Sequence, residues 1–130
     1  MMTIKEVSQE FGISADTLRY YEKIGLIEPV TRNKSGIRDY QESDLKRIKF
    51  LKCMRLSGLS IELLTEYVRL AHEGDHTIPQ RKEILLCQKE QLLLKMKELE
   101  ETLGHLEYKI ETYDDVLSQC DNIVNQQKIN

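Results

Sequence analysis

Three cysteine thiols are the most reactive side chains in this 130-residue chain. Cys53 lies in the segment LKRIKFLKCMRLSG, with Lys49 four residues before it, Lys52 adjacent and Arg55 two residues beyond. Nearby cations stabilise a thiolate, the form of cysteine that attacks aldehydes and other electrophiles. An electrophile sensor at Cys53 is one interpretation. The other is a buried cysteine on a largely apolar helix, whose basic neighbours bind an anionic partner.

Cys87 and Cys120 suggest a second chemistry, metal binding, because they lie near the two ends of one long helical segment. Antiparallel pairing of two such helices would bring Cys87 within a turn or so of the Cys120 of the partner subunit. Two sulfurs make a poor zinc site, since zinc takes four ligands, and the three histidines show no ligand spacing with them. The pattern therefore favours Cys120 as a small interface residue and Cys87 as a surface residue, with no metal. A metal-responsive protein that uses both thiols is the alternative.

The segment TLRYYEKIGL places Arg19 beside two tyrosines, Tyr20 and Tyr21. A guanidinium can bind a guanine edge or a phosphate, and tyrosine hydroxyls can donate to phosphates. Adjacent helical residues point about 100° apart, so the two tyrosines cannot face the same way. One of them, Tyr21 by preference, is expected to pack in the core with its hydroxyl at the water boundary. The segment predicts a helix that faces an anionic polymer, and Thr17 belongs to the same helix.

Local signals around this segment predict a helix-turn-helix. Thr3 and Glu6 fit a capping box for a first helix, which Gly12 can end in a left-handed conformation. Ser14 can cap the second helix, which Gly25 ends. In such a motif the second helix enters the major groove of DNA.

The segment 26–40, LIEPVTRNKSGIRDY, predicts a strand, a turn at NKSG and a second strand. Its three basic residues, Arg32, Lys34 and Arg38, are expected to clamp phosphates as a wing beside the second helix. Further helices are expected to run to about Leu56 and from Ser60 to the glycine at 74.

The last predicted helix, capped by Thr77, carries an apolar stripe with alternating steps of four and three residues. This 3.5-residue period predicts a left-handed coiled coil, a rod of about 60 Å that needs a partner. The flanking charge pairs Lys95–Glu100 and Lys109–Asp114 would suit a parallel pair, whereas extra apolar residues near both ends favour antiparallel pairing in a homodimer. The expected interface residues are Leu92, Met96, Leu99, Leu103, Leu106, Ile110, Tyr113 and Leu117.

Composition sets the remaining expectations. Residues 1–55 hold eleven Lys/Arg and eight Asp/Glu, whereas the whole chain has a formal net charge of −3, so the basic part is the N-terminal head. We expect a mainly α-helical protein with a DNA-binding head at 1–76, a coiled coil at 77–124 and a short tail at 125–130. No membrane span or secretion signal is present, which predicts a cytoplasmic protein without membrane contact. No nucleophile–base pair stands out, so neither an enzyme nor a cofactor is expected.

TLRYYEKIGL, RNKSGIRDY and the later GLSIELL resemble the N-terminal signature of MerR-type transcriptional regulators, and the order of elements agrees over nearly the whole chain. The resemblance implies a homodimer on a palindromic promoter element, which activates transcription by distorting the promoter spacer for RNA polymerase. It implies an antiparallel coiled coil. It also implies DNA contacts from Arg19, Tyr20, Arg38 and Tyr40, with Thr17 and Tyr21 as further candidates.

The segments IKFLKCMRLSGLSIELL and EGDHT resemble the aldehyde-responsive, AdhR/NmlR-like branch of that family. This resemblance implies a sensor thiol at Cys53, a small electrophile as inducer and a role in stress response. The rival from another class is a coiled-coil interaction module whose basic head is incidental.

Overall fold

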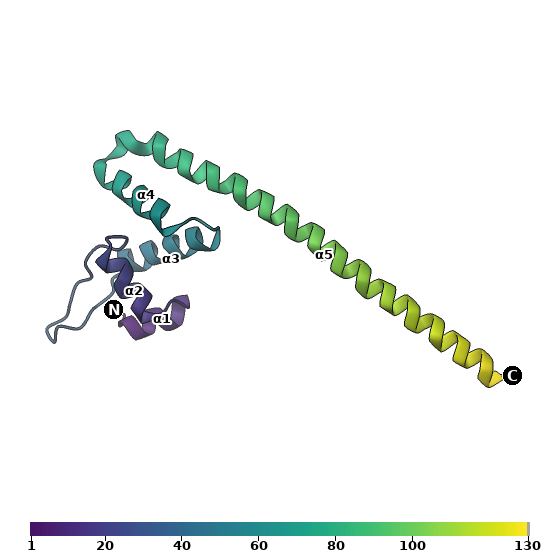
Figure 1. The fold of residues 1–130 in the computed structure, drawn as a ribbon. Coiled ribbons are helices and arrows are strands. Elements are labelled where there is room, and N and C mark those ends of the chain that lie inside the picture. The colour runs from purple at the N-terminus through teal and green to yellow at the C-terminus, as the bar shows by residue number, and fades with distance from the viewer. Residues whose placement is uncertain (130) are drawn as a thin grey trace. The chain divides into compact units, whose positions relative to one another are not determined.

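The computed structural model describes the backbone of residues 1–129 and the side-chain surroundings of residues 1–119. The chain is mainly α-helical, as expected, and forms two compact units, Met1–Glu90 and Gln91–Asn130. The first unit, the head, contains four helices and the beginning of a fifth (Figure 1). The elements in chain order are α1 (Ile4–Phe11), α2 (Ala15–Lys23), α3 (Glu42–Leu56), α4 (Ile61–Glu73), the 3-10 turn η1 (Asp75–Thr77) and α5 (Ile78–Ile129).

Three of the predicted helix starts, those at Thr3, Ser14 and Ser60, are confirmed by their capping geometry. The Glu6 N–H donates to the Thr3 hydroxyl at 3.2 Å and the Thr3 N–H donates to the Glu6 carboxylate at 3.2 Å, which completes the capping box of α1. Gly12 ends α1 with φ 66°, a left-handed conformation that glycine adopts without steric cost. Ser14 and Ser60 cap α2 and α4 through their side chains. Short-range chemistry therefore sets these boundaries.

The core of the head lies where α1 packs on α2 and α3, and where α3 packs on α4. Helices α1 to α4 each contribute fully buried apolar side chains, among them Val7, Leu18, Ile48, Leu51 and Leu64. Ile84 of α5 also packs against this core. The head therefore includes the first turns of α5, whereas the sequence placed its boundary after residue 76.

Thr77 has a different role from the predicted N-cap of the last helix. Its buried hydroxyl donates back to the carbonyls of Leu70 at 2.6 Å and Gly74 at 2.7 Å. Arg81 adds a bond from Nε to the Thr77 hydroxyl at 3.0 Å. Thr77 directly precedes α5, as predicted, but its hydroxyl serves the end of α4, whose free carbonyls also need donors.

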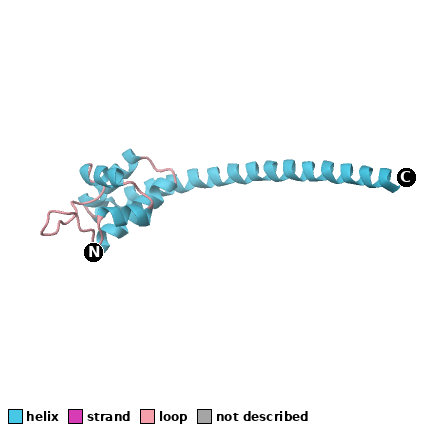
Figure 2. Cartoon of the chain, turned by 90° about the horizontal axis from the view of Figure 1, so that it is seen from below, coloured by secondary structure: helices cyan, strands magenta, loops and turns pink. Residues whose placement is uncertain are grey.

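The segment between α2 and α3 is a hairpin without regular strands, drawn entirely as loop in Figure 2. Its turn lies at NKSG, as predicted: the Gly36 N–H donates to the Asn33 carbonyl at 2.9 Å. Only the bridge between Arg32 and Arg38 joins the two arms, so the prediction of two strands was wrong in extent. An isolated hairpin with few apolar residues has no sheet to pack against, which keeps its ladder short.

The second unit consists of α5 from Gln91 onward. The predicted interface residues share one helical stripe, and all except the half-buried Leu92 are exposed in the single chain. Leu99 is 67% exposed and Leu106 is 58% exposed. Helix α5 continues to Ile129, so residues 125–129, expected as a tail, are helical. Within the described part of the chain, no helix combines the length and apolar character that a bilayer span requires.

Candidate nucleic-acid interface

Helix α2 begins with a local network that fixes its first turn. The Thr17 N–H donates to the Ser14 hydroxyl at 3.1 Å, and that hydroxyl donates to Thr17 Oγ1 at 2.8 Å. Thr17 is half-buried, so its side chain supports the start of the helix and retains a partly accessible edge. Helix N-termini attract anions through their free N–H groups and dipole, which suits this end of α2 to a phosphate.

Arg19 points outward from α2. Its side chain is 49% exposed and forms an ion pair with Asp16 at 2.9 Å, three residues earlier on the same helix. An exposed ion pair of this kind contributes little to stability. The guanidinium can therefore exchange Asp16 for a phosphate or base edge at low cost.

The two tyrosines of α2 diverge, as helix geometry requires. Tyr20 is 47% exposed, whereas Tyr21 is 9% exposed and belongs to the core. The orientation favours Tyr20 as a surface residue that can donate its hydroxyl to a ligand. Tyr21 instead packs in the head, which accords with the packing alternative for that residue.

The hairpin presents two exposed basic residues, Arg32 and Lys34, and a third, Arg38, that is half-buried. The Asn33 side chain accepts the N–H groups of Ser35 at 2.9 Å and Ile37 at 3.1 Å, which holds the tip in shape. Arg32 donates from Nη1 to the Gly36 carbonyl at 2.8 Å. The wing is therefore an ordered basic turn.

Arg38 lies deeper than the other two cations because it pairs with Glu22 of α2. Its Nε donates to one carboxylate oxygen at 3.3 Å and its Nη2 to the other at 3.5 Å. The same carboxylate accepts the N–H of Val30 at 3.2 Å. Both charged side chains are 19% exposed. Glu22 was not among the predicted site residues, although a glutamate in the last turn of a helix opposes the helix dipole and therefore needs a cationic partner.

Tyr40, which the resemblance placed at DNA, is fully buried. Its hydroxyl is enclosed and has no hydrogen-bond partner in the structure. Burial raises the pKa of this hydroxyl, and the charge of Arg38 opposes that effect. A side chain with no exposed surface cannot reach a phosphate in this conformation, so the expected direct contact from Tyr40 is corrected to a core position.

Cys53 is exposed on α3, which removes the alternative of a buried cysteine. Its carbonyl accepts the Ser57 N–H at 3.0 Å in the turn that ends α3. The Ser57 carbonyl in turn accepts Nε2 of Gln88 at 2.6 Å. Gln88 is 6% exposed, so this bond joins the end of α3 to the first part of α5 within the head. No local sequence pattern predicts this contact, because its partners are 31 residues apart.

Cys87 is exposed and has acidic surroundings. Its thiol lies 3.5 Å from the carboxylate of Glu83. That hydrogen bond, followed by partial burial and the charges of Glu83 and Glu90, raises the pKa of the Cys87 thiol, which disfavours the thiolate. The side chain of Cys120 lies outside the described residues. Among the residues whose placement is described, no three His, Cys, Asp or Glu side chains gather as a metal site.

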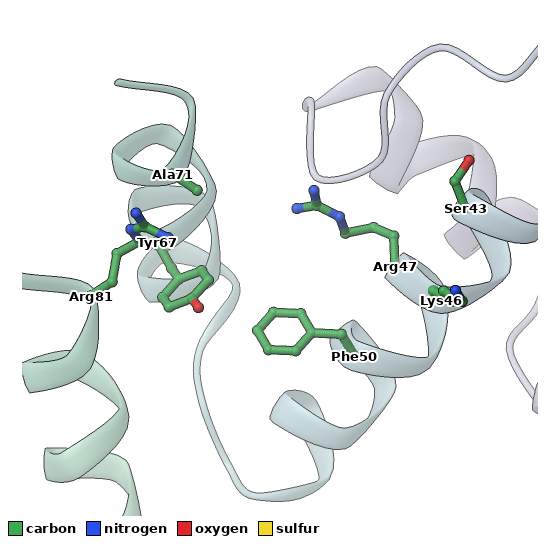
Figure 3. Close-up of a pocket in the computed structure, with 7 residues that line it drawn as sticks. All are labelled: Ser43, Lys46, Arg47, Phe50, Tyr67, Ala71 and Arg81. Atoms are coloured by element: carbon green, nitrogen blue, oxygen red, sulfur yellow. The ribbon is translucent and has the colours of Figure 1, made fainter. Parts of the chain in front are cut away.

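The sequence also missed a groove of about 430 Å³ between α3, α4 and the start of α5 (Figure 3). Phe50 and Tyr67 close the α3–α4 contact with ring centroids 5.5 Å apart. Two of the cations at the rim have other partners: Arg81 bonds to Thr77 and Gly74, and Lys46 lies 3.9 Å from the carboxylate of Glu42. Most of the residues that line the groove therefore already have a structural role in packing or helix capping. The lining residues are Ser43, Lys46, Arg47, Phe50, Tyr67, Ala71 and Arg81.

Known proteins share both the sequence and the fold of this chain. The HTH-type transcriptional regulator AdhR of Bacillus subtilis (strain 168) is 55% identical over 92 residues, which cover 71% of this chain and 66% of AdhR. Heavy metal-dependent transcription regulator 2 of Rhizobium meliloti (strain 1021) is 32% identical over 108 residues, 81% of this chain and 74% of the relative. A crystal structure of HiNmlR, a MerR family regulator lacking the sensor domain, bound to promoter DNA, matches with 32% identity and a TM-score of 0.76, covering 87% and 90% of the two chains.

The match to a family extends over most of the head. Residues 2–71, more than half of the chain, match the family described as MerR HTH family regulatory protein. The match includes α2 and the wing, the elements that expose Arg19, Tyr20, Arg32 and Lys34. These findings favour a DNA-binding regulator over a coiled-coil interaction module with an incidental basic head. The chain belongs to the MerR family of DNA-binding transcriptional regulators.

Proposed function

We propose that this regulator forms a homodimer on a palindromic promoter element and activates transcription in response to aldehydes or related electrophiles. The observation that carries the proposal is the outward orientation of Arg19 and Tyr20 on α2, within the matched family region. An exposed arginine on the second helix of a helix-turn-helix can read base edges or bind phosphates.

The proposed DNA surface combines α2 with the wing. Thr17, Arg19 and Tyr20 supply one set of contacts, and Arg32 and Lys34 supply a second set from an ordered turn. Arg38 can add a phosphate contact through the donors that Glu22 leaves free. Phosphate contacts set register and affinity, and Arg19 contributes most to the choice of sequence.

The homodimer would form through α5. Its apolar stripe is exposed in the single chain and follows a coiled-coil period, which supports pairing with a second copy in antiparallel orientation. Two heads on one rod fit a palindromic site, because operator symmetry mirrors protein symmetry. Activation by distorting the promoter spacer for RNA polymerase is what the family resemblance implies.

Cys53 is the proposed sensor because it is exposed on a helix rich in lysine and arginine, whereas acidic neighbours surround Cys87. An aldehyde would accept the sulfur at its carbonyl carbon. A C–S bond forms, the carbonyl π bond breaks and the thiol proton moves to the oxygen, so the hemithioacetal needs no oxidant. Adducts of this size add few atoms, and a finely balanced switch is required to register them.

The proposed signal path is short. Cys53 lies in the last turn of α3, whose closing residue Ser57 is held by Gln88 of α5. An adduct that shifts this turn would strain the bond to Gln88 and so alter how α3 is fixed to the dimerisation helix.

Arg19→Ala tests the DNA surface. We expect about tenfold or greater loss of affinity for a duplex selected from a random-sequence pool, because one arginine contact to a base or phosphate is lost. The plot of log affinity against log salt should flatten by about 0.9 for a lost phosphate contact. Fluorescence anisotropy at several salt concentrations measures both quantities.

The matched control for Arg19→Ala is Lys89→Ala, which removes the same charge from an exposed position on α5. This control should leave affinity nearly unchanged. Equal affinities for the two variants would remove Arg19 from the interface.

Cys53→Ala tests the sensor, with Cys87→Ala as the control of the same chemistry. Cys53→Ala should bind the selected duplex normally but lose the response to formaldehyde or methylglyoxal in a promoter reporter. Intact-protein mass and peptide mapping after mild treatment should locate the adduct at Cys53. A normal response from Cys53→Ala, or an adduct found mainly at Cys87, would move the sensor to another thiol.

A further inference from the structure

Glu22 is the acceptor for three separate donors from the wing. Its carboxylate binds the Val30 N–H at 3.2 Å, where the chain enters the wing, and the Arg38 guanidinium at 3.3 and 3.5 Å, where the chain returns. The two arms are otherwise joined at the bridge between Arg32 and Arg38. One side chain of α2 therefore ties both arms of the wing to the recognition helix.

Two electrostatic effects oppose a carboxylate at this position. Glu22 lies in the last turn of α2, where the helix dipole disfavours negative charge. Its negative charge also lies on the helix proposed to approach the DNA, where it repels the phosphates. On charge alone, removal of Glu22 should therefore strengthen DNA binding.

We propose that Glu22 is a positioning residue for DNA recognition, which sets the wing at a fixed place beside α2 so that both contact one DNA site together. This inference rests on the proposed DNA surface. The guanidinium of Arg38 has five N–H donors, and Glu22 takes two of them. Arg38 can thus be held by Glu22 and still donate to a phosphate, and its two bonds to the Glu22 carboxylate would fix the plane of the guanidinium.

The positioning role predicts that Glu22→Ala lowers DNA affinity, whereas the charge effect predicts that it raises DNA affinity. The variant therefore distinguishes the two. We expect about tenfold weaker binding of the full-length protein to a duplex selected by the unmodified protein, because charge-assisted bonds that order the wing are lost. Affinity for a random-sequence duplex of equal length should change less, since phosphate contacts survive without a fixed wing. Anisotropy titrations measure both affinities.

Glu28→Ala is the matched control, because Glu28 is an exposed glutamate in the connection between α2 and the wing. It removes the same charge and should leave the affinity unchanged or slightly higher. Glu22→Ala binding as tightly as Glu28→Ala would overturn the proposal. If Arg19→Ala also failed to weaken binding, the DNA surface itself would be wrong; a failure of Glu22→Ala alone would leave that surface intact.

A double-mutant cycle with Arg38→Ala tests the coupling. In the Arg38→Ala background, Glu22→Ala should cost much less affinity than in the unmodified protein, because the two residues act as a pair. Strict additivity would overturn the pairing. Glu22→Gln addresses folding: it keeps an acceptor for Val30 but loses the charge, so it should stay folded by circular dichroism and bind with intermediate affinity. A folded Glu22→Gln with unchanged affinity would count against the proposal.

Discussion

The head and the rod, which is the part of α5 from Gln91 onward, differ in whether their apolar residues are buried within the chain. In the head, Leu18, Ile48 and Leu51 are fully enclosed by neighbouring helices of the same chain. In the unit from Gln91 onward, Leu106 and its companions along α5 remain exposed. The head thus buries its apolar surface without help, whereas the rod can bury its own only against another molecule.

This difference separates two kinds of stability. Burial within one chain gives a free energy of unfolding that does not depend on protein concentration. Burial between chains, as in the proposed dimer, would make the apparent stability of the rod rise with protein concentration, because association and folding would be linked. Destabilising variants of the two units should therefore differ in whether their loss of stability depends on protein concentration.

Leu106→Asp in the rod should have the largest effect. A charge in the middle of the proposed seam would lose its hydration on dimerisation, which costs several kcal/mol. We expect the dimer dissociation constant to rise by about hundredfold or more, as measured by analytical ultracentrifugation. The exposed neighbour gives the control: His105→Asp should remain dimeric. If Leu106→Asp remained dimeric, Leu106 would not lie in the dimer interface, and the interface would use other residues of α5.

Leu51→Ala in the head should have the next largest effect. Truncating a fully buried leucine costs about 2–5 kcal/mol of unfolding free energy, because contacts are lost and a cavity remains. Urea unfolding should show this loss at every protein concentration. The oligomeric state, measured as molecular mass in solution, should match that of the unmodified protein. A loss below about 1 kcal/mol would mean that the head repacks around the cavity.

Tyr40→Phe should have the smallest effect. It tests whether Tyr40 is a core residue or a DNA contact. Removal of a buried hydroxyl without a partner is expected to change stability by about 1 kcal/mol or less, and in the stabilising direction. DNA affinity should be unchanged, whereas Tyr20→Phe should lower it. Loss of DNA affinity in Tyr40→Phe would restore Tyr40 to the interface.

The same variant predicts a pH dependence. Burial raises the pKa of Tyr40 in the folded protein, so the unfolded chain releases this proton first as pH rises. Fewer protons on the unfolded state mean that stability falls with pH above about 10, the ordinary tyrosine value. In urea unfolding at alkaline pH, Tyr40→Phe should lose less stability than the unmodified protein.

Features set by neighbouring residues could be predicted from the sequence. The capping box of Thr3 and Glu6, the caps at Ser14 and Ser60, and the turn that ends at Gly36 all depend on contacts within a few residues. Helical periodicity likewise separated the directions of adjacent tyrosines, although which one turns inward depends on where the rest of the head lies. Local chemistry was thus sufficient for the helix-turn-helix and the long helix.

Features that depend on distant partners could not be predicted. The pairs Glu22–Arg38 and Gln88–Ser57 join segments that only the folded head brings together. Burial of Tyr40 follows from the packing of several segments of the head, whereas the family resemblance had implied a DNA contact for this residue. The shortness of the wing strands reflects the missing neighbouring sheet, which no local pattern reveals.

The bond between Gln88 and Ser57 sets a limit on how strongly the protein can respond through it. A single neutral hydrogen bond contributes about 1 kcal/mol net, which corresponds to about a fivefold shift between two states. A signal transmitted through this contact alone would therefore produce a graded change in transcription as the inducer concentration rises. A steep, switch-like response would require the two subunits of a dimer to change conformation together.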